Sequence, residues 1–236
     1  MLAYVDLHIH SLLSPCSDND MTPNNIINMA VIKGLDIIAI TDHNCAQNTD
    51  AVLKCAKNAG IIAVPGMELE TSEEVHLVCL FPGLEEVMLM QQIVHESLPE
   101  IQNREEIFGS QIIMDKDDND IGHVKQLLLT ASGLSVDTAF NYVNELGGVV
   151  LPAHIDRSSY SILSNLGSIP DDLGVHCVEI SRGCDETQYR SNHPELKKFK
   201  FVKSSDAHHL WDIFERESGL EIFDLSINSL IKALKE

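Results

Sequence analysis

The chain has 236 residues, of which 44% are hydrophobic; this is typical of a globular domain and excludes a disordered or fibrous protein. Its 16 Lys and Arg residues are outnumbered by 36 Asp and Glu residues, giving a formal net charge of −20. Proteins that bind duplex nucleic acid or anionic membranes mainly through phosphate contacts need a basic surface. The charge therefore argues against both kinds of partner.

The sequence predicts a cytoplasmic protein. Its apolar runs, such as residues 35–40, are far shorter than the roughly 20 residues that span a bilayer. The N-terminus reaches Asp6 without the basic start, apolar stretch and cleavage site of a signal peptide. The six cysteines form no C-x-x-C pair, so we expect free thiols rather than disulfides or a thiolate zinc site.

Short apolar runs alternate along the chain with segments of helical character. Strands are expected at residues 3–9, 35–41, 61–68, 76–81, 149–153, 176–180 and 201–204. Helices with recognisable caps or glycine ends are expected at 23–33, 50–58, 84–98, 136–146 and 226–235. Several strands are apolar at consecutive positions, as in parallel sheets covered on both faces. The alternation predicts a (β/α) barrel or a doubly wound sheet, and periodicity does not choose between them.

Residues 83–135 interrupt this alternation. They contain the expected helix 84–98 and then an acidic stretch at 115–120. We expect a single domain over residues 1–236, with residues 83–135 as a small, mainly helical subdomain or lid inserted within it.

Histidines and carboxylates gather where the expected strands end. Asp6, His8 and His10 alternate along the first strand, which predicts that they share one face. Later strand ends carry Asp42-His43, Glu68, His154 and Asp206-x-His208. The C-terminal ends of parallel strands face a common site, so these residues predict a divalent metal cluster. His76 starts its strand and would lie at the opposite rim unless that strand runs differently.

Together these motifs resemble the PHP superfamily, named for polymerase and histidinol phosphatase. The matching motifs are His8-x-His10, Thr41-Asp42-His43, Gly66-x-Glu68, His76, Pro152-Ala153-His154 and Ser205-Asp206-x-His208. The resemblance implies an α/β fold, a distorted seven-stranded (β/α)7 TIM-like barrel that binds two or three divalent ions. The likeness is greatest to the stand-alone phosphoesterase branch, which acts on nucleotides or oligonucleotides. Residues 83–147 match only in position, where relatives carry an inserted helical region.

The resemblance also implies the ligands of three metal sites. The first ion would be held by His8, His10, Glu68 and Asp206. Glu68 would bridge to a second ion, held also by His76 and His154. The third ion would be held by Asp18, His43 and His208, although relatives place the residue matching Asp18 nearer the second histidine, and Asp20 is an alternative. Asp6 and Asp42 would orient imidazoles. This mixture of nitrogen and oxygen ligands suits zinc, manganese or iron.

The implied chemistry is hydrolysis of a phosphate ester by a metal-activated hydroxide. Two ions can lower the pKa of a bridging water and can hold phosphate oxygens. The expected substrate is a nucleotide, a short single-stranded oligonucleotide or a small phosphomonoester. Arg157 and Arg182 follow the fifth and sixth strands and would clamp the phosphate; the alternative for each is a surface ion pair.

Two other interpretations stay open. A metal-dependent amidohydrolase also carries H-x-H after the first strand of a barrel, but such enzymes often have a bridging lysine where this chain has Glu68. A module that binds metal or a nucleotide without catalysis is the second alternative, and the near-complete set of ligands argues against it. The sequence does not determine the oligomeric state or the native metal.

Overall fold

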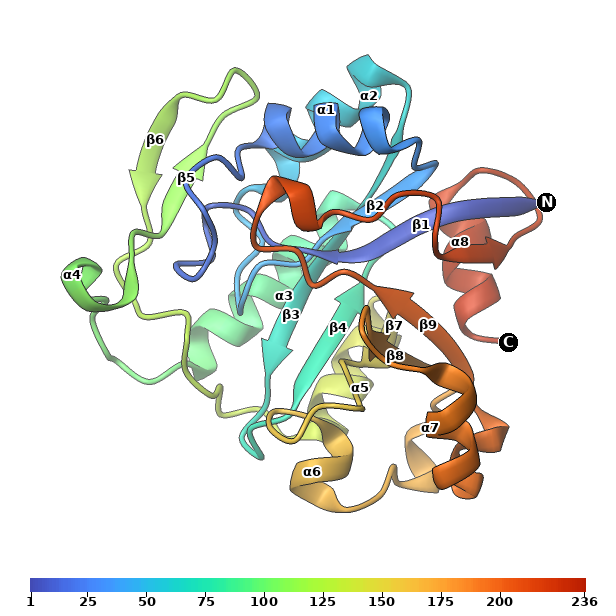
Figure 1. Cartoon of the computed structure of the whole chain (residues 1–236). Coiled ribbons are helices and arrows are strands. Elements are labelled where there is room, and N and C mark those ends of the chain that lie inside the picture. Colours follow the sequence, from blue (N-terminus) through green and yellow to red (C-terminus); the bar gives the residue numbers. More distant parts are fainter.

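A computed structural model describes all residues, Met1–Glu236, and shows a curled sheet with helices outside it (Figure 1). One sheet has the strand order β10-β1-β2-β3-β4-β7. Its strands are β1 (Leu2–Ile9), β2 (Ile37–Ile40), β3 (Ile62–Glu70), β4 (His76–Leu80), β7 (Val149–Pro152) and β10 (Gly219–Glu221). A parallel pair, β8 (Cys177–Ser181) and β9 (Lys200–Ser204), closes the curl, with β8 beside β7 and β9 beside β1. The distorted barrel is therefore confirmed.

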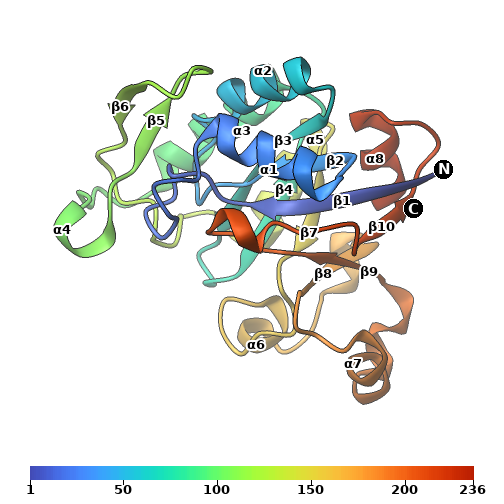
Figure 2. The same ribbon diagram turned by 45° about the horizontal axis from the view of Figure 1, so that its top comes forward.

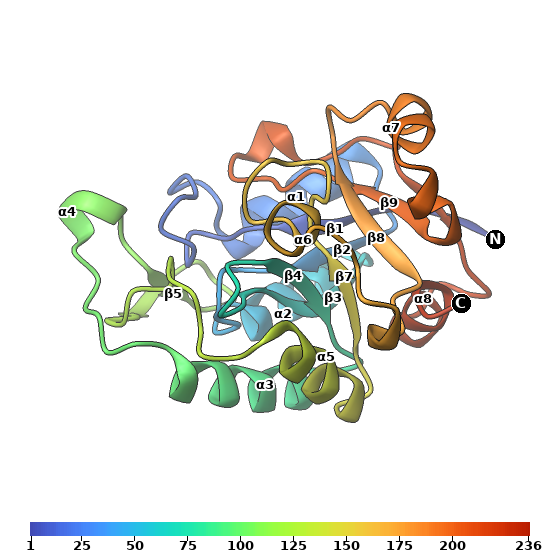
Figure 3. The ribbon, with the colours of Figure 1, turned by 90° about the horizontal axis from the view of Figure 1, so that it is seen from below.

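The long helices lie where the sequence predicts them. They are α1 (Pro23–Lys33), α2 (Thr49–Ala59), α3 (Leu84–Ser97), α5 (Val136–Glu145) and α8 (Ile227–Leu234). Figures 1 and 2 show α1 and α2 over β1–β3, whereas Figure 3 shows α3 and α5 side by side along another side of the barrel. The Thr22 and Ser135 hydroxyls cap α1 and α5 by accepting backbone N–H groups. None of these helices has both the length and the apolarity that crossing a membrane requires.

Several short elements are absent from the sequence-based expectation. They are α4 (Glu105–Phe108), α6 (Ile162–Leu166), α7 (Glu186–Asn192), the 3₁₀ turns η1 (Asp171–Leu173), η2 (Pro194–Lys198) and η3 (Leu210–Asp212), and strand β10. Each is too short to show a periodic pattern of apolar residues. Strand β10 pairs antiparallel with β1 at the edge of the sheet.

Strand β4 runs antiparallel to both of its neighbours, and this explains the position of His76. Its register pairs His76 with Glu70 on β3 and Leu77 with Pro152 on β7. The start of β4 therefore lies at the same rim as the ends of β3 and β7. A tight turn after β3, in which Thr71 N–H donates to Val75 O at 2.9 Å, reverses the chain.

The segment 83–135 contains a β-hairpin that the sequence does not predict. After α3 and α4 come β5 (Ile112–Met114) and β6 (Asp120–His123), and the acidic stretch forms the turn between them. The Asp118 carboxylate accepts hydrogen bonds from Thr22 Oγ1 at 2.7 Å and Asn24 N at 3.1 Å, which ties this turn to the start of α1. The hairpin and α4 lie at the end of the molecule opposite both termini (Figure 1). That this segment is a separate subdomain or lid stays a prediction.

An apolar core fills the barrel and leaves the site at one end of it. Side chains from β1, β2, β3, β4, β7, β8 and β9 pack together, and Leu230, Ile231 and Leu234 of α8 join this core. Leu7 is fully buried in it, whereas Leu2 on the same strand is 51% exposed.

This difference predicts the stability of two matched variants. Leu7→Ala should lower the free energy of unfolding by about 2–5 kcal/mol, because it leaves a cavity in the barrel. Leu2→Ala should change it by no more than about 0.5 kcal/mol. Urea unfolding of the metal-free protein followed by circular dichroism measures both. Equal effects would contradict the placement of this core.

Candidate metal centre

Glu68, near the end of β3, is a buried carboxylate enclosed by five imidazoles. Its side chain is 1% exposed. Oxygen Oε1 lies 2.9 Å from His76 Nδ1, 3.1 Å from His154 Nε2 and 3.3 Å from His8 Nε2. Oxygen Oε2 lies 3.0 Å from His43 Nδ1 and 3.3 Å from His10 Nε2. The strand ends of the barrel therefore bring these residues to one point.

Asp206 follows β9 and adds a second carboxylate. Its Oδ1 lies 3.3 Å from His8 Nε2 and 3.2 Å from His10 Nε2. Asp206 and His154 both adopt left-handed backbone conformations, with φ values of 52° and 30°. Such conformations cost about 1–3 kcal/mol each in residues other than glycine and cluster at functional sites. Here they aim the two side chains into the group around Glu68.

Glu179 on β8 orients His8, and the sequence analysis missed it. Nδ1–H of His8 donates to both Glu179 oxygens, at 3.0 and 3.1 Å, which leaves Nε2 free to bind an ion. Glu179 Oε1 also accepts from His154 N at 3.1 Å. An acidic residue between the apolar Val178 and Ile180 of a buried strand needs a partner, and this signal could have revealed it.

A chain of hydrogen bonds orients His10. Its Nδ1 lies 2.9 Å from Ser14 Oγ, and the Ser14 hydroxyl donates to Asp42 Oδ1 at 2.7 Å. The hydroxyl therefore accepts from His10, which leaves Nε2 of that ring free. Asp42 thus acts on His10 through Ser14 rather than directly.

Asp6 does not orient an imidazole as expected. It accepts backbone N–H groups of Ser205 and Phe214, both at 3.0 Å, and burial raises its pKa to about 6. The register of β1 against β2 shifts between Asp6 and Ile9, so strict alternation of faces ends there. Asp6 therefore fixes the loop that carries Asp206.

The donor set fits divalent ions. Three overlapping groups of potential ligands are present: His8, His10, Glu68 and Asp206; His43, Glu68 and His76; and His10, His43 and His208. Three buried atoms, Glu68 Oε2, Asp206 Oδ1 and His154 Nδ1, form no well-aligned hydrogen bond within the protein, although imidazole nitrogens lie 3.0–3.3 Å from the two oxygens. The Nε2 atoms of His8 and His10 are 3.1 Å apart. Two nitrogens that bind the same ion, each at about 2.0–2.1 Å, are expected to lie roughly 3 Å from each other.

Charge in this cluster is balanced within the protein. Burial opposes ionisation of Glu68, but His76, His8 and His43 outweigh it and hold its pKa well below its usual range. Burial also opposes protonation of His10 and His43, yet the neighbouring carboxylates raise the pKa of each imidazole to about 9. His208 differs, because burial and the adjacent His10 lower its pKa to about 3.

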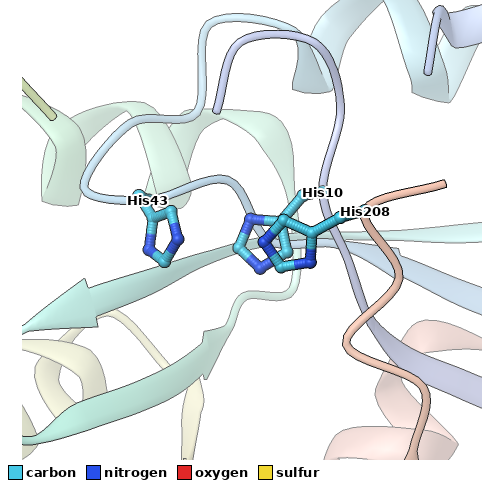
Figure 4. A group of neighbouring side chains, drawn as sticks. All are labelled: His10, His43 and His208. Atoms are coloured by element: carbon cyan, nitrogen blue, oxygen red, sulfur yellow. The ribbon is translucent and has the colours of Figure 1, made fainter. Parts of the chain in front are cut away.

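Three imidazoles from three loops form the outer group (Figure 4). The ring of His10 lies between those of His43 and His208, with centroids 4.5 and 4.3 Å away. Asp18, the carboxylate expected to join them, does not belong to this group. Its Oδ2 lies 3.4 Å from His209 Nδ1. The role of Asp18 as a ligand stays a prediction.

The two arginines lie in different surroundings. Arg157 lines the pocket over the cluster, which has a volume of about 320 Å³, and its Nη2 lies 2.7 Å from Asp206 Oδ2. Arg182 is not among the residues that line this pocket. Its guanidinium lies 4.6 Å from the centre of the Phe214 ring and 3.9 Å from Glu217 Oε1. Phosphate binding by either arginine stays a prediction.

A larger hollow of about 940 Å³ lies between the loop after β2, α3 and the β5–β6 segment. Asn44 and Leu128 line it, and their chain neighbours His43 and Leu129 line the pocket over the cluster. The two hollows are therefore adjacent. Many of the residues lining the larger one carry side-chain amides: Asn44, Gln47, Gln91, Gln92, Gln102 and Gln126.

Comparison with known proteins identifies one family. The model of the PHP domain matches residues 6–150, more than half of the chain. A 5'-3' exoribonuclease of Haemophilus influenzae is 32% identical over 78 residues, which cover 32% of this chain and 27% of that protein. A 3',5'-nucleoside bisphosphate phosphatase of Chromobacterium violaceum is 33% identical over 82 residues, covering 34% of this chain and 28% of that protein. The matches thus span less than a third of either relative.

A solved structure shows the same fold over the whole chain. The lesion-specific endonuclease Q of Pyrococcus furiosus superposes with a TM-score of 0.71 and 20% identity, covering 100% of this chain and 56% of its own. At this identity the likeness concerns the fold alone. An endonuclease Q structure also contains a 27-mer duplex substrate with an abasic lesion at the active site.

The Glu179–His8 contact predicts a loss of metal affinity on mutation. Glu179→Gln should weaken zinc binding by about 10- to 100-fold, because the amide no longer fixes the orientation and basicity of His8. Competition with a chromophoric chelator measures this. Glu195→Gln is the matched control, since Glu195 contacts His193 at 3.1 Å but both are exposed. Equal affinities of the two variants would contradict the role of Glu179.

The raised pKa values predict that metal binding releases protons. At pH 7 His10 and His43 hold protons in the metal-free protein, and ions bind only neutral imidazole. Affinity should therefore rise between pH 7 and about 9. Calorimetric titrations in buffers of different ionisation enthalpy count the protons. The count should be unchanged in His123→Ala, which removes an exposed imidazole paired with Asp120 and Glu105. Binding heats that do not depend on the buffer would overturn the expectation.

Proposed function

The chain belongs to the PHP family, and from this premise we propose that it is a metal-dependent hydrolase of phosphate esters. The observation that carries the proposal is Glu68, a buried carboxylate shared by two of the three potential ligand groups. A structural zinc site needs only four ligands and is closed. Overlapping groups beside an open pocket instead favour several neighbouring ions that can contact a substrate.

One proposed set of ligands, His8, His10, Glu68 and Asp206, is a group found in the structure and would hold one ion. Glu68, His76 and His154 would hold a second, because both imidazoles lie within 3.1 Å of Glu68 Oε1. When bound, such ions activate water at neutral pH and stabilise negative charge on phosphoryl oxygens. Glu179 and Ser14 keep the ligand nitrogens of His8 and His10 directed at the ions. We assign Arg157 to the phosphate, because its guanidinium lies in the pocket and is 44% exposed.

The proposed substrate is a nucleotide or the end of a short single-stranded oligonucleotide. The pocket over the cluster has room for a phosphate group and adjoining atoms, and the adjacent hollow could take more of a chain. Two relatives, a 5'-3' exoribonuclease and a 3',5'-nucleoside bisphosphate phosphatase, support a substrate of the nucleotide class. The net charge argues against duplex binding, but the duplex in endonuclease Q makes duplex DNA a necessary arm of the test.

We also propose that the chain forms a single domain. Within it, residues 83–135 would border the substrate. Lys125, His123 and His95 of this segment line the larger hollow beside the pocket. Lys125 supplies a fixed positive charge there, which suits a phosphate-bearing substrate, whereas Glu96 and Glu100 line the same hollow and make its charge mixed.

Phosphate release by metal-loaded protein tests the function. The substrates would be a nucleoside 3',5'-bisphosphate, a 5'-phosphorylated RNA oligonucleotide and a duplex with an abasic site, with simple amides as comparison. Asp206→Asn and His154→Ala should each lower kcat/KM by more than about 100-fold, since a ligand contributes more than the residue behind it. His193→Ala, which changes an exposed imidazole, should have little effect.

Each contrary outcome identifies an alternative. Hydrolysis of amides without phosphate release would indicate an amidohydrolase. Ion binding without turnover of any substrate would indicate a module that binds metal or nucleotide.

A further inference from the structure

The third group of ligands lacks a carboxylate, and this raises the question of what completes it. Its imidazoles come from His10, His43 and His208, but the Nε2 atom of His10 already faces Glu68 and Asp206. Two imidazoles then remain for a third ion. Because a reactive metal site commonly has three protein ligands and one open position, one further protein ligand is needed.

Asp18 is held away from this position by its surroundings. Its backbone N–H donates to His208 O at 2.9 Å, and its carboxylate lies beside the ring of His209.

The loop before Asp18 is instead held firmly against the site. Ser14 Oγ contacts His10 and accepts the backbone N–H of His43 at 3.1 Å. Ser17 N–H donates to Ser14 O at 2.9 Å, which closes a turn around Pro15 and Cys16. On the outer side Gly109, with φ 97°, packs so closely on Pro15 that a side-chain carbon there would clash with the Pro15 carbonyl oxygen.

This turn places the Cys16 thiol beside the outer imidazoles. Cys16 lines the pocket together with His43 and His208. The thiol is also among the neighbours that raise the pKa of the His43 imidazole, after the larger effect of Glu68. Cys16 is also the exposed member of the six free cysteines, whereas Cys184 is half-buried and the other four are buried.

We propose that Cys16, rather than Asp18, completes a third metal site with His43 and His208. This inference rests on the proposed function, because it concerns an ion beside the same pocket. A thiolate with two imidazoles is a softer set than the carboxylate-rich group around Glu68 and favours zinc over manganese or magnesium. The third ion would then differ in kind from the first two, and oxidation of the thiol would release it.

Cobalt substitution tests the proposal without relying on activity. Cobalt-loaded protein should show a near-ultraviolet sulfur-to-cobalt charge-transfer band, and Cys16→Ser should lose both the band and one ion per chain. Asp18→Asn is the matched control and should keep both. In a Cys184→Ser background, zinc should also slow the reaction of Cys16 with a thiol reagent.

The outcomes distinguish a failure of the Cys16 assignment from a failure of the proposed function. Loss of the ion in Asp18→Asn, with no thiolate band in the unchanged protein, would overturn the assignment of Cys16 and leave the ions around Glu68 intact. A band that survives in Cys16→Ser would assign it to another cysteine and overturn the proposal equally. Failure of any ion to bind would overturn the proposed function itself.

Discussion

The burial of the Glu68 carboxylate is the constraint on which the rest of the site depends. A charged group at 1% exposure is costly unless partners surround it, and here five imidazoles do so. Those imidazoles arrive from different parts of the barrel, which explains two unusual features. Strand β4 is reversed so that His76 reaches the same rim, and the backbone at His154 is strained so that its ring turns inward.

A layer of residues behind the imidazoles determines how they can act. Glu179 hydrogen-bonds Nδ1 of His8, and Ser14, which donates to Asp42, hydrogen-bonds Nδ1 of His10. The Nε2 atoms of the two rings therefore face each other. Two facing nitrogens at 3.1 Å are unfavourable unless a proton or an ion lies between them. The neighbouring carboxylates Asp206 and Glu68 raise the pKa of His10 to about 9, which favours protons here in the metal-free protein, whereas the adjacent His8 opposes them. We therefore expect metal binding to exchange ions for protons in a site that is already arranged.

The rim is built differently from the centre. It consists of loops, and the segment 83–135 braces one of them where Gly109 meets Pro15. This contact links a region far along the chain to the position of Cys16 and therefore to the outer imidazoles. Under the proposed function, substrate choice would depend on the same rim, because Arg157, Cys16 and the adjacent hollow all lie there. Variation in these loops could change the substrate while the centre around Glu68 stays constant.

The sequence by itself determined the strands, the long helices and the order of the histidine and carboxylate motifs, because buried strands and capped helices leave local patterns. It also placed Glu68 among the candidate ligands. Only the tertiary structure decided the direction of β4, the partners of Asp6 and the role of Glu179. The first depends on strand pairing, and the other two depend on side-chain hydrogen bonds between residues 199 and 171 positions apart. The same holds for Asp18 and Cys16: they lie two residues apart, and the folding of one loop decides which of them faces the imidazoles.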